Sequence, residues 1–131
     1  MYTIPKQLLK FCGQEDLLTM DVASWLSDQG LLFTHIPNEG KRTFTQSAKI
    51  RLLGVLAGLP DIAIFEPNKY YSGLFIELKV IYPSGKKNSL SRSQKDVLEK
   101  LNLRGYKGVV CYSLNEVKKV VTDYLKDRKK E

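Results

Sequence analysis

The sequence predicts an α/β domain in which helices flank a mixed central β-sheet. Apolar residues recur at helical spacing in four segments between residue 15 and the C-terminus. Short segments rich in β-branched and aromatic residues lie between them, as expected of strands. The resulting order is helix, strand, helix, strand, strand, helix, strand, helix, which is typical of a mixed sheet covered by helices. The length suits a single domain over residues 1–131.

The first half of the chain supplies two predicted helices and one strand. A helix is predicted over residues 15–28, and its apolar stripe consists of Leu18, Val22, Trp25 and Leu26. The Gln29-Gly30 pair ends it, because glycine readily adopts the conformation that closes a helix. Residues 31–36 form a predicted strand, which Pro37 terminates. A second helix is predicted over residues 45–56, and its apolar face consists of Ala48, Leu52, Leu53 and Leu56.

The second half supplies three strands and two helices. Strands are predicted over 62–65 and 73–82, and the latter is the strongest in the chain because it is rich in Phe, Ile, Leu and Val. A helix is predicted over 91–103, with the apolar face Val97, Leu98 and Leu101. Residues 109–112 form the last predicted strand. Ser113 and Glu116 have the spacing of a capping box, and the final helix carries Val117, Val120, Val121 and Leu125.

Composition and charge narrow the functional classes. The net charge of +7 is uneven: residues 1–66 hold six basic and seven acidic residues, whereas residues 67–131 hold fifteen and seven. An excess of Lys and Arg favours a polyanionic partner such as DNA, and a solubilising surface is an equal alternative. No apolar run reaches membrane-spanning length, and Cys12 and Cys111 lack zinc-site spacing. We expect a cytoplasmic protein with reduced thiols, no signal peptide and no membrane contact.

Glu77 and Lys79 are the first residues that suggest chemistry. Side chains alternate along a strand, so these two share one face, about 6–7 Å apart. Taken alone, the pattern is more typical of an amphipathic strand whose charges face water. A hairpin between the 62–65 and 73–82 strands would bring Asp61 near Glu77, and a hard divalent cation relieves the repulsion between adjacent carboxylates. The alternative interpretation of Asp61 is a turn residue after proline.

Glu15 and Gln94 are polar residues in phase with apolar helix faces. Glu15 precedes Val22 by seven residues, so an inward acid there would need a cation or a metal-bound water as its partner. Its alternative is a first-turn acid favoured by the helix dipole. Gln94 is in phase with the apolar face of the 91–103 helix, and its alternative is a capping box with Ser91. Three carboxylates, a lysine and an amide at one sheet edge suit phosphodiester hydrolysis.

The spacing of Pro60-Asp61 and Glu77-Leu78-Lys79 resembles the PD-(D/E)xK nuclease superfamily. More specifically, the chain resembles the VRR-NUC family and its small stand-alone phage and bacterial members. The resemblance covers about residues 15–112. The other segments that carry it are Glu15 to Trp25, His35-Ile36-Pro37-Asn38, Gly58 to Asp61, Ser91 to Gln94 and Leu101 to Tyr106. It implies a restriction-endonuclease-like core in which the 45–56 helix is an insertion.

The resemblance also implies roles for the site residues. Asp61, Glu77 and the Leu78 backbone carbonyl would bind Mg²⁺ or Mn²⁺, and Lys79 would be the catalytic lysine. Gln94 would be the amide of the following helix.

The resemblance also implies roles for residues of the first helix and for His35 in the following strand. Glu15 would be the helix-borne acid that reaches the metal or its waters, with Asp16 as the substitute if the helical phase is shifted by one residue. Thr19 departs from the family pattern, since members often have glutamine there. His35, the only histidine, is by itself more typical of a structural residue than of a general base, but the resemblance places it where it can contact phosphate or water.

Basic residues surround the predicted site. Lys86, Lys87 and Arg92 follow the catalytic strand, and Lys41 and Arg42 lie on the other side. We expect these five residues to contact DNA phosphates without reading sequence.

The sequence therefore predicts a Mg²⁺- or Mn²⁺-dependent endodeoxyribonuclease acting on structured DNA. The resemblance implies branched substrates such as Holliday junctions. A two-fold symmetric junction needs two active sites, so we expect a homodimer, with exposed apolar candidates for its interface on the 45–56 helix and at Tyr70-Tyr71. The alternatives are a catalytically inactive DNA-binding module with the same basic surface, and an interaction protein whose charges only aid solubility.

Overall fold

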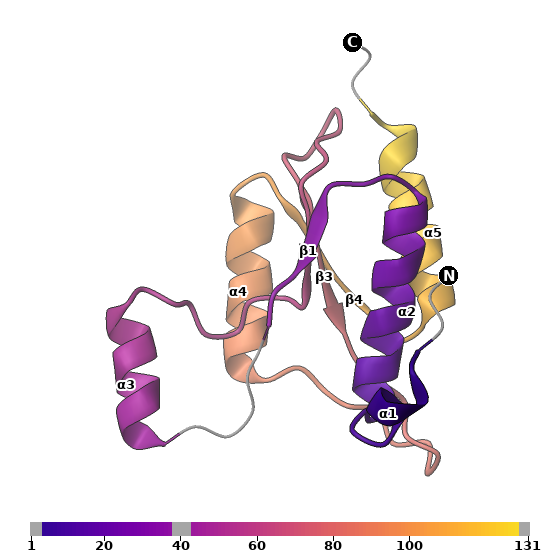
Figure 1. The fold of residues 1–131 in the computed structure, drawn as a ribbon. Helices are drawn as coiled ribbons and strands as arrows, with labels where there is room; N and C mark the ends of the chain where they lie inside the picture. The colour runs from indigo at the N-terminus through magenta and orange to yellow at the C-terminus, as the bar shows by residue number, and fades with distance from the viewer. Residues whose placement is uncertain (1–3, 38–42, 129–131) are drawn as a thin grey trace.

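The computed structural model describes residues 4–37 and 43–128. Its elements are α1 (Lys6–Leu9), α2 (Gln14–Asp28), β1 (Phe33–His35), α3 (Phe44–Leu52), β2 (Ile62–Ile64), β3 (Leu74–Leu78), α4 (Arg92–Leu103), β4 (Lys107–Cys111) and α5 (Leu114–Lys126). Apart from the short α1, this is the predicted order. The α/β class with a mixed sheet flanked by helices is confirmed (Figure 1).

The four strands lie in the order β1-β2-β3-β4. β2 pairs antiparallel with both β1 and β3, whereas β3 and β4 are parallel and are joined through α4. The register places His35 opposite Ile62, and Leu78 opposite Cys111. The ends of β1, β3 and β4 therefore meet the start of β2 at one edge of the sheet, and α2, α4 and α5 also begin at this edge (Figure 1).

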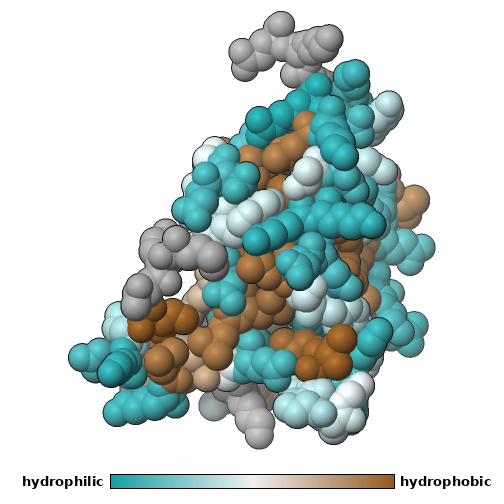
Figure 2. Space-filling view, turned by 90° about the vertical axis from the view of Figure 1, so that its right-hand side faces the viewer, coloured by the Kyte–Doolittle hydropathy of each residue, from teal (hydrophilic) through white to brown (hydrophobic). Residues whose placement is uncertain are grey.

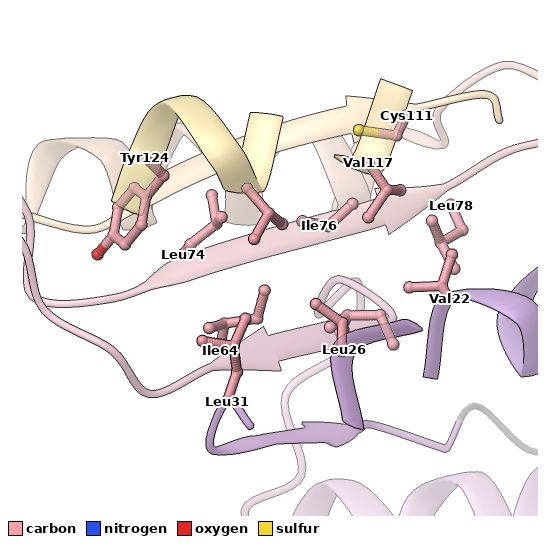
Figure 3. Packing of buried hydrophobic residues seen from close by; sticks show 12 residues of the cluster. Val22, Leu26, Leu31, Ile64, Leu74, Ile76, Leu78, Cys111, Val117 and Tyr124 are labelled. Carbon is pink, nitrogen blue, oxygen red and sulfur yellow. The ribbon is translucent and has the colours of Figure 1, made fainter. Parts of the chain in front are cut away.

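The main core lies between the sheet and the helices α2 and α5. Alternate β3 residues Leu74, Ile76 and Leu78 point toward these helices and are buried. They pack with helix residues that Figure 3 shows at close range, namely Val22, Leu26, Val117 and Tyr124. Hydrophilic residues cover much of the outer side of this layer, and apolar ones gather toward its lower part (Figure 2).

The opposite face of the sheet is covered by α4, which buries Val97 and Leu98. A Cβ atom at Gly108 would lie 2.8 Å from Leu98 Cδ2, so α4 packs on β4 through the Leu98 side chain. α4 also lies beside the second face of β3, where Gln94 reaches Glu77.

Several predicted boundaries need correction. The 45–56 helix ends at Leu52, none of its residues is buried, and Leu52, Leu53 and Leu56 of the predicted apolar face are exposed. In Figure 1 this helix lies apart from the sheet, beyond α4. Residues 79–82 lie beyond β3, and Ile81 pairs with Lys87 in a short hairpin. Glu116 accepts a hydrogen bond from the Tyr112 backbone and not from Ser113 as predicted, although Ser113 does cap α5.

Cys12 and Cys111 are free thiols. Among the described residues, no helix is long and apolar enough to cross a membrane.

Candidate active site

Asp61 is held in place by its main chain and by its side chain. The backbone carbonyl of Asp61 accepts hydrogen bonds from the Ile36 N–H at 2.7 Å and from His35 Nδ1 at 3.0 Å. Its carboxylate oxygen Oδ2 accepts a third from the Leu78 backbone N–H at 2.7 Å. Asp61 therefore ties the ends of β1 and β3 together at the edge where β2 begins.

The segment before Asp61 runs closely against α4. Gly58 has a φ of +88°, and a Cβ atom there would lie 2.5 Å from the carbonyl oxygen of Ser93. Pro60 is fully buried. Only glycine permits this approach without strain. The loop that carries Asp61 therefore packs directly against the first turn of α4.

Glu77 and Lys79 are buried and do not face water. Their relative exposures are 3% and 8%. The Nζ atom of Lys79 lies 3.7 Å from Oε1 of Glu77. The interpretation of Glu77-Leu78-Lys79 as a solvated amphipathic strand is therefore wrong, because α4 covers the face on which Glu77 lies.

Gln94 fulfils both of its competing interpretations. Its Nε2 donates to Glu77 Oε1 at 3.0 Å. Its Oε1 accepts from the Ser91 backbone N–H at 2.9 Å, and Ser91 Oγ accepts from the Gln94 N–H, which completes a capping box. The amide is thereby held with its donor end toward the carboxylate.

The electrostatics of Glu77 reflect this environment. The pKa of Glu77 is raised from 4.5 to about 8, mainly by burial and further by the charge and hydrogen-bonding contact of Asp61, while Lys79 acts to lower it. Two carboxylates that share a low-dielectric site cannot both ionise easily. Lys79 alone does not compensate both negative charges.

A divalent cation would fit this pair of carboxylates. Carboxylate oxygens are ligands that Mg²⁺ prefers, and Mg²⁺ retains several waters, so two protein carboxylates can suffice. Within residues 4–37 and 43–128, no three His, Cys, Asp or Glu side chains form a ready-made ligand cluster. Asp61 and Glu77 are therefore the two side chains that could hold such a cation.

Glu15 lies near Asp61 but contacts another partner. A cavity of about 460 Å³ is lined by Glu15, Asp16, Thr19, His35 and Asp61, among others. Glu15 is exposed, and its Oε1 accepts a hydrogen bond from Asn88 Nδ2 at 2.9 Å. The structure thus brings Asp61, Glu77, Lys79 and Gln94 into one group and leaves Glu15 at its margin.

Asn88 is the site residue that sequence reasoning missed. Its backbone N–H donates to the Val80 carbonyl, and its own carbonyl accepts from the Tyr112 hydroxyl. Asn88 therefore anchors the hairpin to the sheet while its side chain holds Glu15. No periodicity signals a contact between residues 73 positions apart in the sequence.

The predicted DNA-binding residues are only partly described. Lys86, Lys87 and Arg92 are exposed on the hairpin and at the start of α4. Lys87 Nζ lies 5.3 Å from the centre of the Tyr112 ring. Lys41 and Arg42 lie outside the described residues.

Comparisons with known proteins show the family and a similar fold. The family model described as the VRR-NUC domain matches residues 13–115. A solved structure described as "VRR_NUC domain protein" superposes with a TM-score of 0.74 at 27% sequence identity, covering 90% of this chain and 93% of that chain. No curated protein matches the sequence at a significant level.

Proposed function

This chain belongs to the VRR-NUC domain family, and from that premise we propose that it is a metal-dependent endodeoxyribonuclease acting on structured DNA. The family implies nuclease-type activity within the PD-(D/E)xK superfamily. One observation carries the finer proposal. The half-buried Asp61 and the buried Glu77 form an interacting carboxylate pair, with the Lys79 ammonium 3.7 Å from Glu77. We take residues 1–131 as one nuclease domain.

Each residue has a role in hydrolysis. Asp61, Glu77 and the Leu78 carbonyl would hold Mg²⁺ or Mn²⁺, and Glu15 would reach the metal or its waters. A bound cation would stabilise charge on the phosphate and lower the pKa of water. Gln94 keeps Glu77 in position through its amide. Lys79 would orient the attacking water or neutralise charge that develops on the phosphate.

The proposed reaction is a simple hydrolysis. The water oxygen forms a bond to phosphorus, and the bond from phosphorus to the leaving deoxyribose oxygen breaks. One water proton ends on the leaving oxygen and the other on the new phosphate, so atoms and charges balance.

We further propose that the substrates are branched DNA such as Holliday junctions, of the kind that arise in DNA repair. Cutting two strands of such a two-fold symmetric junction needs two active sites, which calls for a homodimer. Lys86, Lys87 and Arg92, with Lys41 and Arg42, would contact the phosphates. The expected setting is the cytoplasm of a bacterial or phage-infected cell.

The test is cleavage of labelled junction, flap, single-stranded and linear duplex DNA with Mg²⁺ or Mn²⁺. We expect wild type to cut junctions best and Glu77→Ala to lose cleavage. Glu99→Ala is the matched control, because Glu99 is an exposed carboxylate on α4. If wild type cuts none of these substrates, or if Glu77→Ala cuts as well as Glu99→Ala, the proposal fails. Salt-sensitive binding without cleavage would instead favour the inactive DNA-binding module.

A further inference from the structure

His35 has a defined position beside the proposed site but no assigned task. It lies at the end of β1, opposite Ile62 in the register, and it lines the 460 Å³ cavity together with Asp61 and Glu15. It is the only histidine in the chain. A side chain at this place can meet whatever enters the cavity.

The hydrogen bond to Asp61 determines which ring nitrogen carries a proton. His35 Nδ1 lies 3.0 Å from the Asp61 carbonyl oxygen. A carbonyl oxygen can only accept, so Nδ1 must be the donor. When the ring is neutral, Nε2 then carries a lone pair and no proton.

This tautomer restricts what Nε2 can bind. Phosphate oxygens are acceptors, so a neutral His35 cannot hydrogen-bond to a DNA phosphate through Nε2. A water molecule can donate a hydrogen bond to this Nε2 lone pair. Because the Asp61 carbonyl fixes the ring, the lone pair is held in one direction, which is the kind of preorganisation that positions a reacting group.

We propose that His35 is a further catalytic residue, whose Nε2 accepts a hydrogen bond from the water that attacks phosphorus. The inference rests on the proposed nuclease function. It assigns the orientation of water to the cavity that Asp61 and His35 share. Lys79, which contacts Glu77, then has the remaining role of neutralising charge on the phosphate.

Two substitutions distinguish the role of His35 Nδ1 from that of Nε2. The amide of His35→Asn can replace Nδ1 and keep the contact with the Asp61 carbonyl, but it is too short to reach the place of Nε2. The longer His35→Gln can place a carbonyl oxygen near the position of Nε2. The measurements are single-turnover cleavage of a junction with Mg²⁺, the dissociation constant for the same junction in EDTA, and the thermal unfolding midpoint.

We expect His35→Asn to cut at least about tenfold more slowly than wild type, as is typical when a group that handles a reacting proton or water is lost. His35→Gln should recover part of the rate, and DNA affinity and the unfolding midpoint of both variants should match wild type. A His35→Asn rate equal to wild type would overturn the inference. A loss of cleavage rate accompanied by an equal loss of DNA affinity would also overturn it, because that pattern indicates a phosphate contact. A loss of rate accompanied by a lower unfolding midpoint would overturn it too, because that pattern indicates a structural role. In all three cases wild type still cuts, so the proposed function survives. If wild type cuts nothing, both proposals fall.

Discussion

Gln94 joins the first turn of α4 to Glu77 through the two ends of one amide. Its Nε2 donates to Glu77 Oε1 at 3.0 Å, while its Oε1 accepts from the Ser91 backbone N–H at 2.9 Å. A substitution that keeps the acceptor and removes the donor would therefore separate helix capping from support of Glu77.

Gln94→Glu is that substitution. A glutamate at this position can still complete the capping box, but it places a third carboxylate beside Glu77 and Asp61. We expect a stability loss of about 1–3 kcal/mol, the usual cost of leaving a buried polar group without its partner, together with slower cleavage. Gln46→Glu in the capping box of α3 is the matched control and should change neither. Urea unfolding and single-turnover cleavage measure both effects, and equal behaviour of the two variants would contradict the prediction.

The raised pKa of Glu77 predicts how stability depends on pH when metal is absent. Its pKa is about 8 in the folded protein against 4.5 for an ordinary glutamate. Between these values the folded protein keeps a proton that the unfolded chain has released. The contribution of Glu77 to the free energy of unfolding is therefore complete below its unfolded pKa. It is lost as pH rises through the folded pKa, by at most about 1.4 kcal/mol per pH unit.

Unfolding in EDTA between about pH 5 and 8 tests this slope. Glu77→Gln should flatten the curve, because it removes the titrating group, whereas Glu99→Gln on the exposed face of α4 should follow wild type. Parallel curves for wild type and Glu77→Gln would refute the assignment.

Gly58 and Gly54 allow a matched test of how closely the loop that carries Asp61 packs on α4. Both have a φ of +88°, but a Cβ atom at Gly54 meets nothing within 4 Å, whereas at Gly58 it meets Ser93. Gly54→Ala should cost only backbone strain of about 1–2 kcal/mol. Gly58→Ala should cost more and should also impair cleavage, because the loop must move away from α4. Equal unfolding free energies would show that the close approach has no energetic importance.

The basic hairpin should govern the salt dependence of DNA binding. Each phosphate neutralised contributes about 0.9 to the slope of log affinity against log salt. The double variant Lys86→Ala, Lys87→Ala should therefore bind more weakly and lower that slope by about 2 if both residues contact phosphates. Lys100→Ala, which removes an exposed charge near the far end of α4, is the control. A titration of a labelled junction over a range of KCl concentrations gives both slopes. An unchanged slope in the double variant would show that the hairpin lysines do not contact DNA phosphates.

Local patterns predicted the core of the site because each depends on only a few neighbouring residues. Strand alternation correctly put Glu77 and Lys79 on one face, and helical phase put Gln94 toward the sheet. Whether that face is covered depends on how α4 packs against the sheet, through contacts such as that of Leu98 with Gly108. Burial of Glu77 and Lys79 is therefore a tertiary property that local periodicity does not contain.

The errors have the same physical origin. The 45–56 helix is predicted from apolar spacing alone, but Gly54 has a positive φ just beyond Leu52, and Leu52, Leu53 and Leu56 are exposed. The partner of Glu15 is Asn88, which reaches it only through the hairpin after β3. Contacts of this kind depend on long-range geometry and leave no signal in either local sequence.

The proposed homodimer makes a prediction about α3. Leu52 and Leu53 are 89% and 70% exposed, which is unusual for adjacent large apolar residues unless a partner covers them. Tyr71 is a weaker candidate, because it already stacks on Tyr124. Leu52→Glu should therefore shift the protein toward monomer and slow junction cleavage, since a charge in an apolar interface is costly. Leu103→Glu, at a residue 76% exposed on α4, should leave both unchanged. Analytical ultracentrifugation distinguishes the cases: a monomeric wild type would end the dimer proposal, and a dimeric Leu52→Glu would remove α3 from its interface.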